Sequence, residues 1–566
     1  MRWTLKPKPK PEIVATLMAS LGVGVNIATL LAQRGIETYE QAKKFFRPSL
    51  KDLHDPFLMK DMGKAVERIE SALLNNENIL VFGDYDVDGT TSVALMSSYL
   101  KTRSERIATY IPDRYNEGYG VSYQGIDFAS DNDVSLIIAL DCGIKAIDKV
   151  NYAAKKGVDF IICDHHRPSA ELPKAVAVLD PKRADCDYPY KELCGCGVGF
   201  KLVQALASRD GQTIDDLIEY QDLVATAIGA DIVPITGENR TLAYFGLKVI
   251  NQNPRPGIKA LIEQVKKKEL TITDVVFIVA PRINAAGRMK HGNYAVTLLT
   301  EKDIEKSKDY AAEINKFNLD RREADQRITE EALAQITENK EEERLTSVVY
   351  QKDWHKGVIG IVASRLTETY YRPTLVFTKS GEKLAASARS VSGFDVYNAL
   401  EACSQHIEQF GGHKYAAGLT LKEENYQAFK QAFEDEVSHT IDRKLLTPEI
   451  KVDLEIGLDQ INGKFWRILK QFAPFGPGNM TPVFMTQNLM DTGQGKCVGE
   501  DDKHLRVVVT QSGSMRNQSR FVGIAFNLGD KCDLILDSKP FCAVYSIDEN
   551  HWQGNVSLQL KLRDLK

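Results

Sequence analysis

Residues 81–92 read VFGDYDVDGTTS and place three carboxylates at alternate positions, Asp84, Asp86 and Asp88, directly after the apolar run at residues 79–82. Carboxylates this close repel one another unless a cation lies between them. The stretch therefore predicts a metal site at the end of a buried strand, provided that the rest of the chain supplies further ligands.

Short apolar runs alternate with amphipathic segments between about residues 75 and 240. NILVF, VSLIIAL and DFIIC are typical of buried strands, whereas TTSVALMSSYLK and KAIDKVNYAAKKG have helical spacing. Fully apolar short strands between helices indicate a parallel sheet covered on both faces. Ligands of such sheets collect at the carboxyl ends of the strands, which is where the acidic stretch lies.

Three further acidic signals follow apolar runs. SLIIALDCG ends near Asp141, DFIICDHH supplies Asp164, His165 and His166, and VATAIGADIVP reaches Asp231. Carboxylate oxygen is the ligand that Mg²⁺ and Mn²⁺ prefer, and imidazole favours Mn²⁺ or a similar ion. Two ions about 3.5–4 Å apart would activate water and hold a phosphate oxygen for in-line attack, so the residues predict a two-metal phosphoesterase.

The rest of the chain predicts three further parts. From residue 293 to residue 356 there is no glycine or proline, which predicts a long connecting helix over residues 301–345. A smaller α/β domain follows over residues 346–445, and short strand-like segments over residues 446–566 predict a small antiparallel barrel. With a helical lead-in over residues 1–45 and a catalytic domain over residues 46–300, the fold class is two α/β domains joined by a helix, plus a β-barrel.

Composition is that of an ordinary globular protein. The 566 residues are 43% hydrophobic and 26% charged, with a net charge of −5, so a surface that is basic throughout is excluded but a local basic groove is not. The nine cysteines form no C-x-x-C pair, which supports neither a disulfide framework nor a zinc ribbon. No apolar run of about 18 residues occurs, so we expect a cytoplasmic protein without a membrane span.

One alternative starts from the same opening stretch. DVDGT matches the D-x-D-G-T nucleophile loop of haloacid-dehalogenase-like phosphatases, in which the first aspartate attacks phosphorus. Such an enzyme would also need a downstream lysine and a later acidic pair, and it would have no use for CDHH. The wider set of motifs therefore favours the metal centre.

The ordered motifs GDYDVDG, LDCG, CDHH and GADIVP resemble those of the DHH phosphoesterase superfamily. PRINAAGRM, WHKGVIGIVASRL, SARS and GGHKYAAGL resemble the RecJ single-stranded-DNA exonucleases within it, and FAPFGPGNMTPVF resembles the start of their oligonucleotide-binding (OB) domain. The likeness covers nearly the whole chain. It implies two divalent cations, Mn²⁺ or Mg²⁺.

The resemblance also implies roles around those cations. Asp141 would bridge them, Asp164 would orient the neighbouring imidazole, and His166 would face the scissile phosphate. Asp84 lies close by with its role open, since this chain has Phe82 where some DHH relatives have histidine. The implied metal ligands are Asp86, Asp88, Asp141, His165 and Asp231.

Substrate contacts are implied by the later motifs, which match the DHH-associated domain called DHHA1. The glycines of GGHKYAAGL would let phosphate approach the backbone at a helix N-terminus, although a tight packing turn needs the same small residues. Structural ion pairs remain the alternative for each arginine. The implied substrate-binding residues are Arg282, Asn284, Arg288, Ser387, Arg389, Gly411, Gly412 and His413. CGCGVGF has the wrong spacing for a dinucleotide fingerprint and is interpreted as the close-packed start of a helix.

The implied function is a processive 5′→3′ exonuclease that degrades single-stranded DNA to 5′-mononucleotides in repair and recombination. The implied partners are single-stranded DNA, a single-strand-binding protein and a RecQ-type helicase, and a monomer is expected. Two alternatives stay open: a phosphodiesterase acting on cyclic dinucleotides or short RNA, and a non-catalytic single-strand-binding scaffold. Phe472, Phe475 and Phe484 could stack bases or belong to the barrel core.

Overall fold

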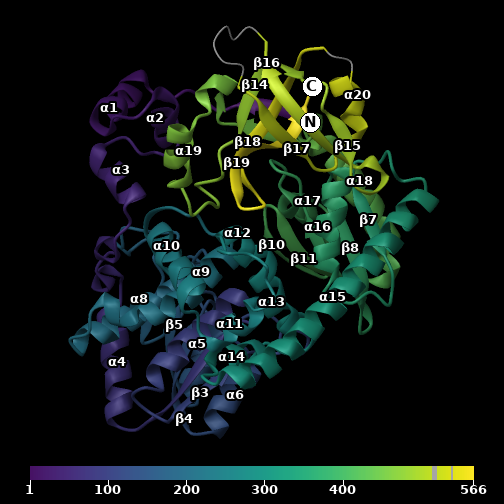
Figure 1. Cartoon of the computed structure of the whole chain (residues 1–566). Coiled ribbons are helices and arrows are strands. Elements are labelled where there is room, and N and C mark those ends of the chain that lie inside the picture. The colour runs from purple at the N-terminus through teal and green to yellow at the C-terminus, as the bar shows by residue number, and fades with distance from the viewer. Residues whose placement is uncertain (513–518, 537–538) are drawn as a thin grey trace. The chain divides into compact units, whose positions relative to one another are not determined.

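The computed structural model describes residues 1–512, 519–536 and 539–566, and the chain divides into two compact units (Figure 1). One unit contains His54–Val233 and Phe245–Pro448. The other contains Met1–Leu53, Pro234–Tyr244 and Glu449–Lys566. Each unit therefore gathers segments that are far apart in the sequence.

The first unit contains a five-stranded sheet in the order β3-β2-β4-β5-β6, in which every pairing is parallel. Its strands are β2 (Asn78–Gly83), β3 (Ile107–Tyr110), β4 (Val134–Leu140), β5 (Asp159–Cys163) and β6 (Ala177–Leu179). This confirms the parallel sheet predicted from the apolar runs.

Helices cover both faces of this sheet. Leu80 and Phe82 of β2 share a core cluster with Ile126 of α6 (Tyr123–Asp131) and Val150 of α7 (Ile147–Lys155). The alternate residue, Val81, is also fully buried. The helices α5 (Val87–Leu100), α8 (Gly195–Arg209) and α9 (Gln221–Ala230) pack together, and the first two contact the strands directly. A strand that is buried on both faces needs the continuous apolar run that this sequence has.

The same unit holds a long helix and a second sheet. The helix α15 (Ile304–Glu338) buries one stripe, including Ile314, Ile328 and Ile336, which confirms the predicted connecting helix. The sheet order is β10-β11-β9-β8-β7, with only β7 and β8 parallel. Its strands are β7 (Ser347–Tyr350), β8 (Thr374–Ser380), β9 (Lys383–Arg389), β10 (Gln409–His413) and β11 (Ala416–Lys422). The helices α16 (Ile359–Tyr370) and α18 (Tyr426–Thr440) accompany it.

The other unit is built around a barrel in the order β13-β14-β18-β19-β17-β16-β15, which a pairing between β14 and β16 closes. The prediction of an all-antiparallel barrel is wrong for two pairs, because β17 runs parallel to β19 and β13 parallel to β14. The strands are β13 (Leu454–Glu455), β14 (Phe484–Asp491), β15 (Lys496–Val498), β16 (His504–Gln511), β17 (Phe521–Ala525), β18 (Phe541–Trp552) and β19 (Asn555–Leu565).

The N-terminal segment belongs to the barrel unit. The strand β1 (Arg2–Leu5) pairs in parallel with β12 (Glu449–Val452). Buried residues of α1 (Pro11–Leu21), α2 (Val25–Ala32) and α3 (Tyr39–Phe46) join one core cluster with Phe472 and Phe484 of the barrel region. These two phenylalanines are therefore core residues, and Phe475 is half-buried beside them. The structure also pairs Cys497 with Cys532, which the cysteine spacing did not predict.

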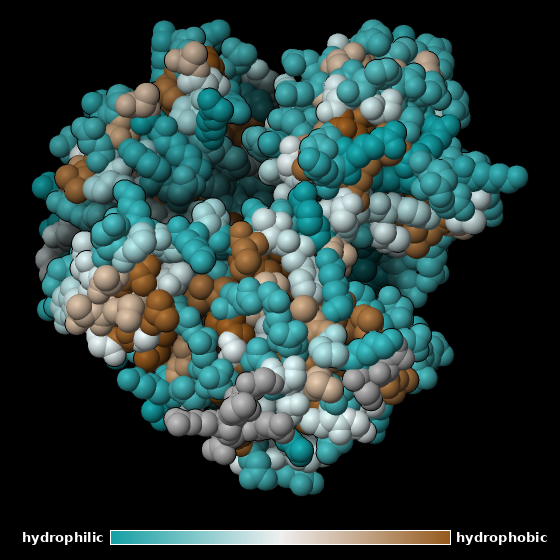
Figure 2. All heavy atoms as spheres, turned by 90° about the horizontal axis from the view of Figure 1, so that it is seen from above, coloured by the Kyte–Doolittle hydropathy of each residue, from teal (hydrophilic) through white to brown (hydrophobic). Residues whose placement is uncertain are grey.

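The face of the molecule drawn in Figure 2 is mainly polar. Hydrophilic side chains cover most of the face drawn in Figure 2, with hydrophobic ones in small groups between them. Within the described residues, no single helix is long and apolar enough to cross a membrane, and the one pair that passes that test together, α1 and α2, is bent by 120°.

Candidate metal centre

The predicted ligands gather at one edge of the parallel sheet. Asp84 follows β2, Asp141 follows β4 and Asp164 follows β5, so the register of the three strands brings their carboxyl ends together. Asp231 does not follow a strand but lies at the C-terminal end of the helix α9. The backbone of Asp141 is left-handed, with φ of 59°, which turns the chain sharply as it leaves the strand.

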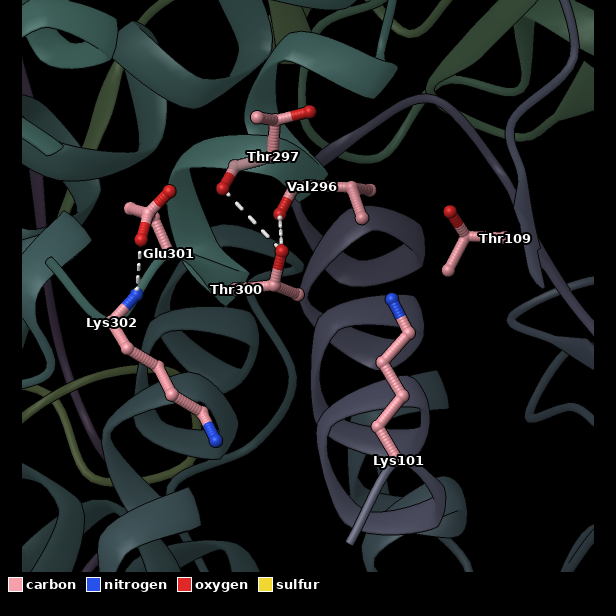
Figure 3. A pocket seen from close by; sticks show the side chains of 7 residues that line it. All are labelled: Lys101, Thr109, Val296, Thr297, Thr300, Glu301 and Lys302. Carbon is pink, nitrogen blue, oxygen red and sulfur yellow. Dashed lines mark hydrogen bonds between the residues drawn. The ribbon is translucent and has the colours of Figure 1, made fainter. Parts of the chain in front are cut away.

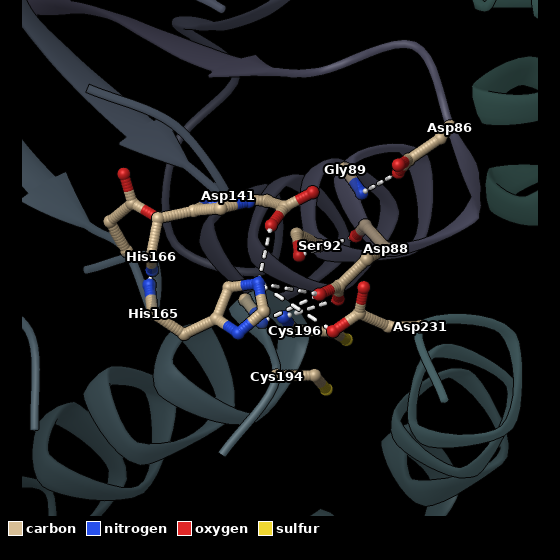
Figure 4. Close-up of polar contacts among 12 residues, drawn as sticks. Asp86, Asp88, Gly89, Ser92, Asp141, His165, His166, Cys194, Cys196 and Asp231 are labelled. Carbon is tan, nitrogen blue, oxygen red and sulfur yellow. Dashed lines mark hydrogen bonds and ion pairs between the residues drawn. The ribbon is translucent and has the colours of Figure 1, made fainter. Parts of the chain in front are cut away.

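Four side chains converge on one point (Figure 4). The Nε2 atom of His165 lies 3.2 Å from Oδ1 of Asp141, 3.7 Å from Oδ2 of Asp88 and 3.6 Å from Oδ2 of Asp231. His165 also lies in a second group of potential ligand atoms with Asp141 and His166. The structure therefore brings together Asp88, Asp141, His165 and Asp231, as the motifs implied.

The buried carboxylates of this group repel one another, and a bound cation would relieve that repulsion. Burial, and then repulsion from the neighbouring aspartates, raises the pKa of Asp88 to about 6 and that of Asp231 to about 8. The pKa of Asp141 also rises, for the same reasons. Burial lowers the pKa of His165 to about 3, so its imidazole is neutral and keeps a lone pair for a metal. Bound divalent cations would favour the ionised carboxylates and so lower these raised pKa values.

Several buried polar atoms of the group, and one of the neighbouring Asp84, have no hydrogen-bond partner among the described residues. They are Oδ2 of Asp84, Oδ1 of Asp141 and both ring nitrogens of His165. Buried polar atoms are nearly always satisfied, so these atoms indicate a missing ligand. Because the donor set is rich in oxygen and includes a neutral imidazole, it fits Mn²⁺ or Mg²⁺.

Asp84 and Asp86 stand apart from that convergence. Oδ1 of Asp86 accepts a hydrogen bond from the backbone N–H of Gly89 at 3.1 Å, so Asp86 caps α5. Asp84 accepts one from the N–H of Gly120 at 3.3 Å, and burial, then repulsion by Asp86, raises its pKa to about 8. Neither belongs to the two close groups of potential ligands. Their parts in metal binding and catalysis stay predictions.

Asp164 holds His166 in place. Oδ1 of Asp164 accepts hydrogen bonds from Nδ1 of His166 at 2.7 Å and from the backbone N–H groups of His165 and His166. Burial alone would raise the pKa of Asp164, but the bond to His166 outweighs it and the pKa falls to about 2. Burial lowers the pKa of His166, but this carboxylate raises it above its ordinary value. The other ring nitrogen of His166 lies 3.2 Å from the hydroxyl of Tyr119, a residue that the motifs did not indicate.

The helix α8 contributes to the site in a way that the sequence analysis missed. The backbone N–H groups of Gly195 and Cys196 donate to the carboxylate of Asp88 at 2.6 and 2.7 Å. A Cβ atom on Gly195 would lie 2.5 Å from Cβ of Asp141, closer than two such atoms approach. The small residues of CGCGVGF were correctly interpreted as a close-packed helix start, but nothing in that pattern showed that the packing partners are two of the aspartates.

Three of the predicted substrate residues, Arg288, Ser387 and Arg389, lie near one another. Arg389 donates to the hydroxyl of Ser387 at 3.0 Å, and Arg288 donates to the carbonyl of Gly357 at 3.0 Å. Burial, then repulsion by Arg114 and Arg389, lowers the pKa of Arg288 to about 10, whereas Asp86 raises it. The guanidinium groups of Arg288 and Arg389 therefore lie near each other, and that of Arg288 lies near Asp86 of the acidic stretch.

The other predicted substrate residues have different surroundings. Arg282 donates to Oδ1 of Asn315 at 2.8 Å, and Oδ1 of Asn284 is buried without a partner among the described residues. Gly411, Gly412 and His413 lie in β10 and are exposed. The expectation of a helix N-terminus at GGHKYAAGL is wrong, because β10 and β11 form an antiparallel hairpin there.

A polar cavity of about 420 Å³ lies apart from the acidic cluster (Figure 3). Lys101 comes from the end of α5, and Thr297 and Thr300 come from α14 (Asn293–Thr300). None of its lining residues is a predicted site residue. The cavity is therefore not part of the candidate metal centre.

Comparisons with known proteins agree with this geometry. Residues 78–228 match the DHH family N-terminal domain, residues 343–439 the DHHA1 domain and residues 452–564 the RecJ OB domain. The single-stranded-DNA-specific exonuclease RecJ of Escherichia coli K12 is 34% identical over 94% of both chains. The chain belongs to the RecJ family. The Bacillus subtilis RecJ is 35% identical over all of this chain and 70% of its own length.

Solved RecJ structures also share the fold. The crystal structure of RecJ from Thermus thermophilus in complex with Mn²⁺ matches with a TM-score of 0.85 and 27% identity, over all of this chain and 79% of that one. A second RecJ structure bound to manganese is 31% identical and covers 70% of this chain and 97% of its own, with a TM-score of 0.61. Both α/β domains and the barrel are thus those of the RecJ fold.

The raised pKa values predict how stability depends on pH without metal. Asp84 and Asp231 have a pKa of about 8 when folded, so between about pH 5 and 8 the folded chain holds protons that the unfolded chain has released. The free energy of unfolding should therefore fall as pH rises through this window. We expect the melting temperature in EDTA to fall from about pH 5 to pH 8, and saturating Mn²⁺ to remove or reverse that slope. A melting temperature in EDTA that rises with pH would contradict the coupling among these carboxylates.

Proposed function

We propose that this protein is a metal-dependent exonuclease that hydrolyses single-stranded DNA from the 5′ end and releases 5′-mononucleotides. The observation that carries the proposal is the convergence of Asp88, Asp141 and Asp231 on Nε2 of His165, within 3.2–3.7 Å. Membership of the RecJ family supports the substrate class. The Mn²⁺ and Mg²⁺ complexes of the Thermus thermophilus enzyme support these ions as cofactors.

Each residue of the centre has a part in this chemistry. Bound cations would supply an activated water and neutralise charge on the phosphate. Asp88, Asp141, His165 and Asp231 would hold them, with Asp86 completing the set. Asp164 raises the pKa of His166 and fixes its ring through Nδ1, so His166 would offer an N–H donor to the reacting phosphate and stabilise the charge that develops there.

The direction of degradation would follow from the arginines. Arg288 and Arg389, with the hydroxyl of Ser387, present N–H and O–H donors close to the acidic stretch. Guanidinium groups bind phosphate in a bidentate manner, so this cluster suits a terminal 5′-phosphate. A strand held by its 5′ end would place its first internucleotide bond at the cations.

Labelled strands test the proposal. With Mn²⁺, a single strand labelled at its 5′ end should lose its label at once as a mononucleotide, whereas a 3′-labelled strand should release its label last. A blunt duplex of the same sequence should resist. Release from the 3′ end first would overturn the polarity, and hydrolysis of dinucleotides in preference to long strands would favour a small-substrate phosphodiesterase. No metal-dependent product at all would indicate a binding scaffold.

We further propose the domain boundaries expected from the sequence, at about residues 45, 300, 345 and 445, and a monomeric, cytoplasmic protein. A single-strand-binding protein and a RecQ-type helicase would supply the single strands. Family membership supports these points, and size-exclusion chromatography with light scattering would test the monomer.

A further inference from the structure

Four guanidinium groups surround a cavity of about 430 Å³ that the proposed chemistry does not use. Phe277 belongs to a single π-helical turn (Val275–Val279), Pro281 and Arg282 to α13 (Ala280–Met289), Arg321 and Arg322 to α15, and Arg365 to α16. No carboxylate is among the lining residues that the structure describes. Irregular turns of this kind are frequent at functional sites.

The positive charge of the cavity is only partly compensated. Asp325, a buried residue behind the wall, accepts two hydrogen bonds from Arg365 at 2.8 Å and lies 3.6 Å from Arg321. Arg282 binds the neutral amide of Asn315. Arg322 is exposed and has no partner among the described residues. Asp325 and Glu368 both act on Arg365, so two carboxylates face four guanidinium groups. Like charges that are left in excess in this way indicate an anionic ligand.

The apolar side of the cavity specifies the ligand further. The ring of Phe277 is 74% exposed, although it lies directly beside the guanidinium groups. An exposed aromatic ring next to arginines is the arrangement that binds single-stranded nucleic acid, because the base stacks on the ring while the phosphate pairs with the guanidinium group. We propose that this cavity binds one nucleotide of a DNA single strand, with its phosphate on the arginines and its base on Phe277.

The cavity would hold the strand away from the bond being cut. The proposal rests on the proposed function and adds a second point of attachment to it. Arg321, which lines the cavity, is also one of the positive charges that lower the pKa of Arg288 beside the acidic stretch. Two separated attachment points on one strand raise the overall affinity only for strands long enough to span them.

Binding without cleavage tests the inference. In EDTA, fluorescence anisotropy would measure the affinity for 3′-labelled oligothymidylates of about 4 to 20 nucleotides, with unlabelled dTMP as a competitor. We expect Arg322→Gln and Phe277→Ala each to weaken binding of the longest strand about fivefold or more, and to leave the shortest unaffected. The slope of log K against log salt concentration should become shallower by about 0.7 in Arg322→Gln, because one contact between a positive charge and phosphate is lost. In Phe277→Ala the slope should not change, because no charge is removed.

Lys316→Gln is the matched control. Lys316 is exposed, its replacement removes the same charge from α15, and it lies about 120° around the helix from Arg322. Unchanged melting temperatures would show that all three variants fold. The inference would be overturned if both test variants bound the longest strand with wild-type affinity, or if Lys316→Gln lost as much affinity as they do. It would also be overturned if the variants lost affinity for dTMP alone and not for the longest strand. Cleavage of labelled strands by the wild-type protein with Mn²⁺ tests the proposed function separately, since that activity can stand while the cavity proves irrelevant.

Discussion

Replacing Asp141 by asparagine is expected to abolish nucleotide release, with a loss of at least about 1000-fold, or roughly 4 kcal/mol of transition-state stabilisation. Oδ1 of Asp141 is buried without a hydrogen-bond partner among the described residues and lies 3.2 Å from Nε2 of His165. Asparagine keeps the shape but loses the charge that would hold the cations. Initial rates on a 5′-labelled strand, with Mn²⁺ varied to saturation, would measure the effect.

The same change should leave the fold intact and stabilise the protein in EDTA, because it removes one of several mutually repelling carboxylates. Asp133→Asn is the matched control: Asp133 also has a left-handed backbone, with φ of 52°, in the turn before the same strand, but it is exposed. Asparagine tolerates that conformation, so the control should keep full activity. Activity of Asp141→Asn above about a tenth of wild type would remove Asp141 from the metal centre.

Replacing Gly195 by alanine should have the second largest effect. The added Cβ would lie 2.5 Å from Cβ and 2.7 Å from Oδ1 of Asp141, and both residues are buried. Relief of that overlap must shift Asp141 or the start of α8, whose N–H groups hold Asp88. We expect activity to fall about 100-fold and stability to fall by about 1–3 kcal/mol, measured by steady-state rates and by urea unfolding in EDTA.

Gly197→Ala tests whether this effect is specific. Gly197 lies in the same first turn of α8, but its added Cβ would meet Leu193 no closer than 3.4 Å, an ordinary contact. Alanine favours a helix over glycine, so this variant should be neutral or more stable by about 0.5–1 kcal/mol, with normal activity. Equal losses in the two variants would show that the damage comes from the helix and not from Asp141.

Local sequence patterns predicted most strands and several site residues of the first unit. The buried strands were predictable because residues 79–82 and 136–140 are continuously apolar, as both faces of a covered sheet require. Asp84, Asp141 and Asp164 were predictable as site residues because each directly follows such a strand, whereas Asp231 follows an apolar run that forms α9. By contrast, GGHKYAAGL has no clear period of about 2 or 3.6, and pairing with β9 makes it a hairpin.

Sequence alone therefore determined most strands of the sheet, though not β3, and which carboxylates and imidazole collect at its edge, since strand polarity and alternation act over a few residues. Only the tertiary structure decided that the N-terminal helices share a core with the barrel, that β17 lies parallel to β19, and that Gly195 packs on Asp141. It also separated Arg282 from Arg288, which lies later on the same helix, and placed Arg282 in a different basic cavity. These contacts join distant segments, and their free energy depends on shape and charge in three dimensions, which no local pattern records.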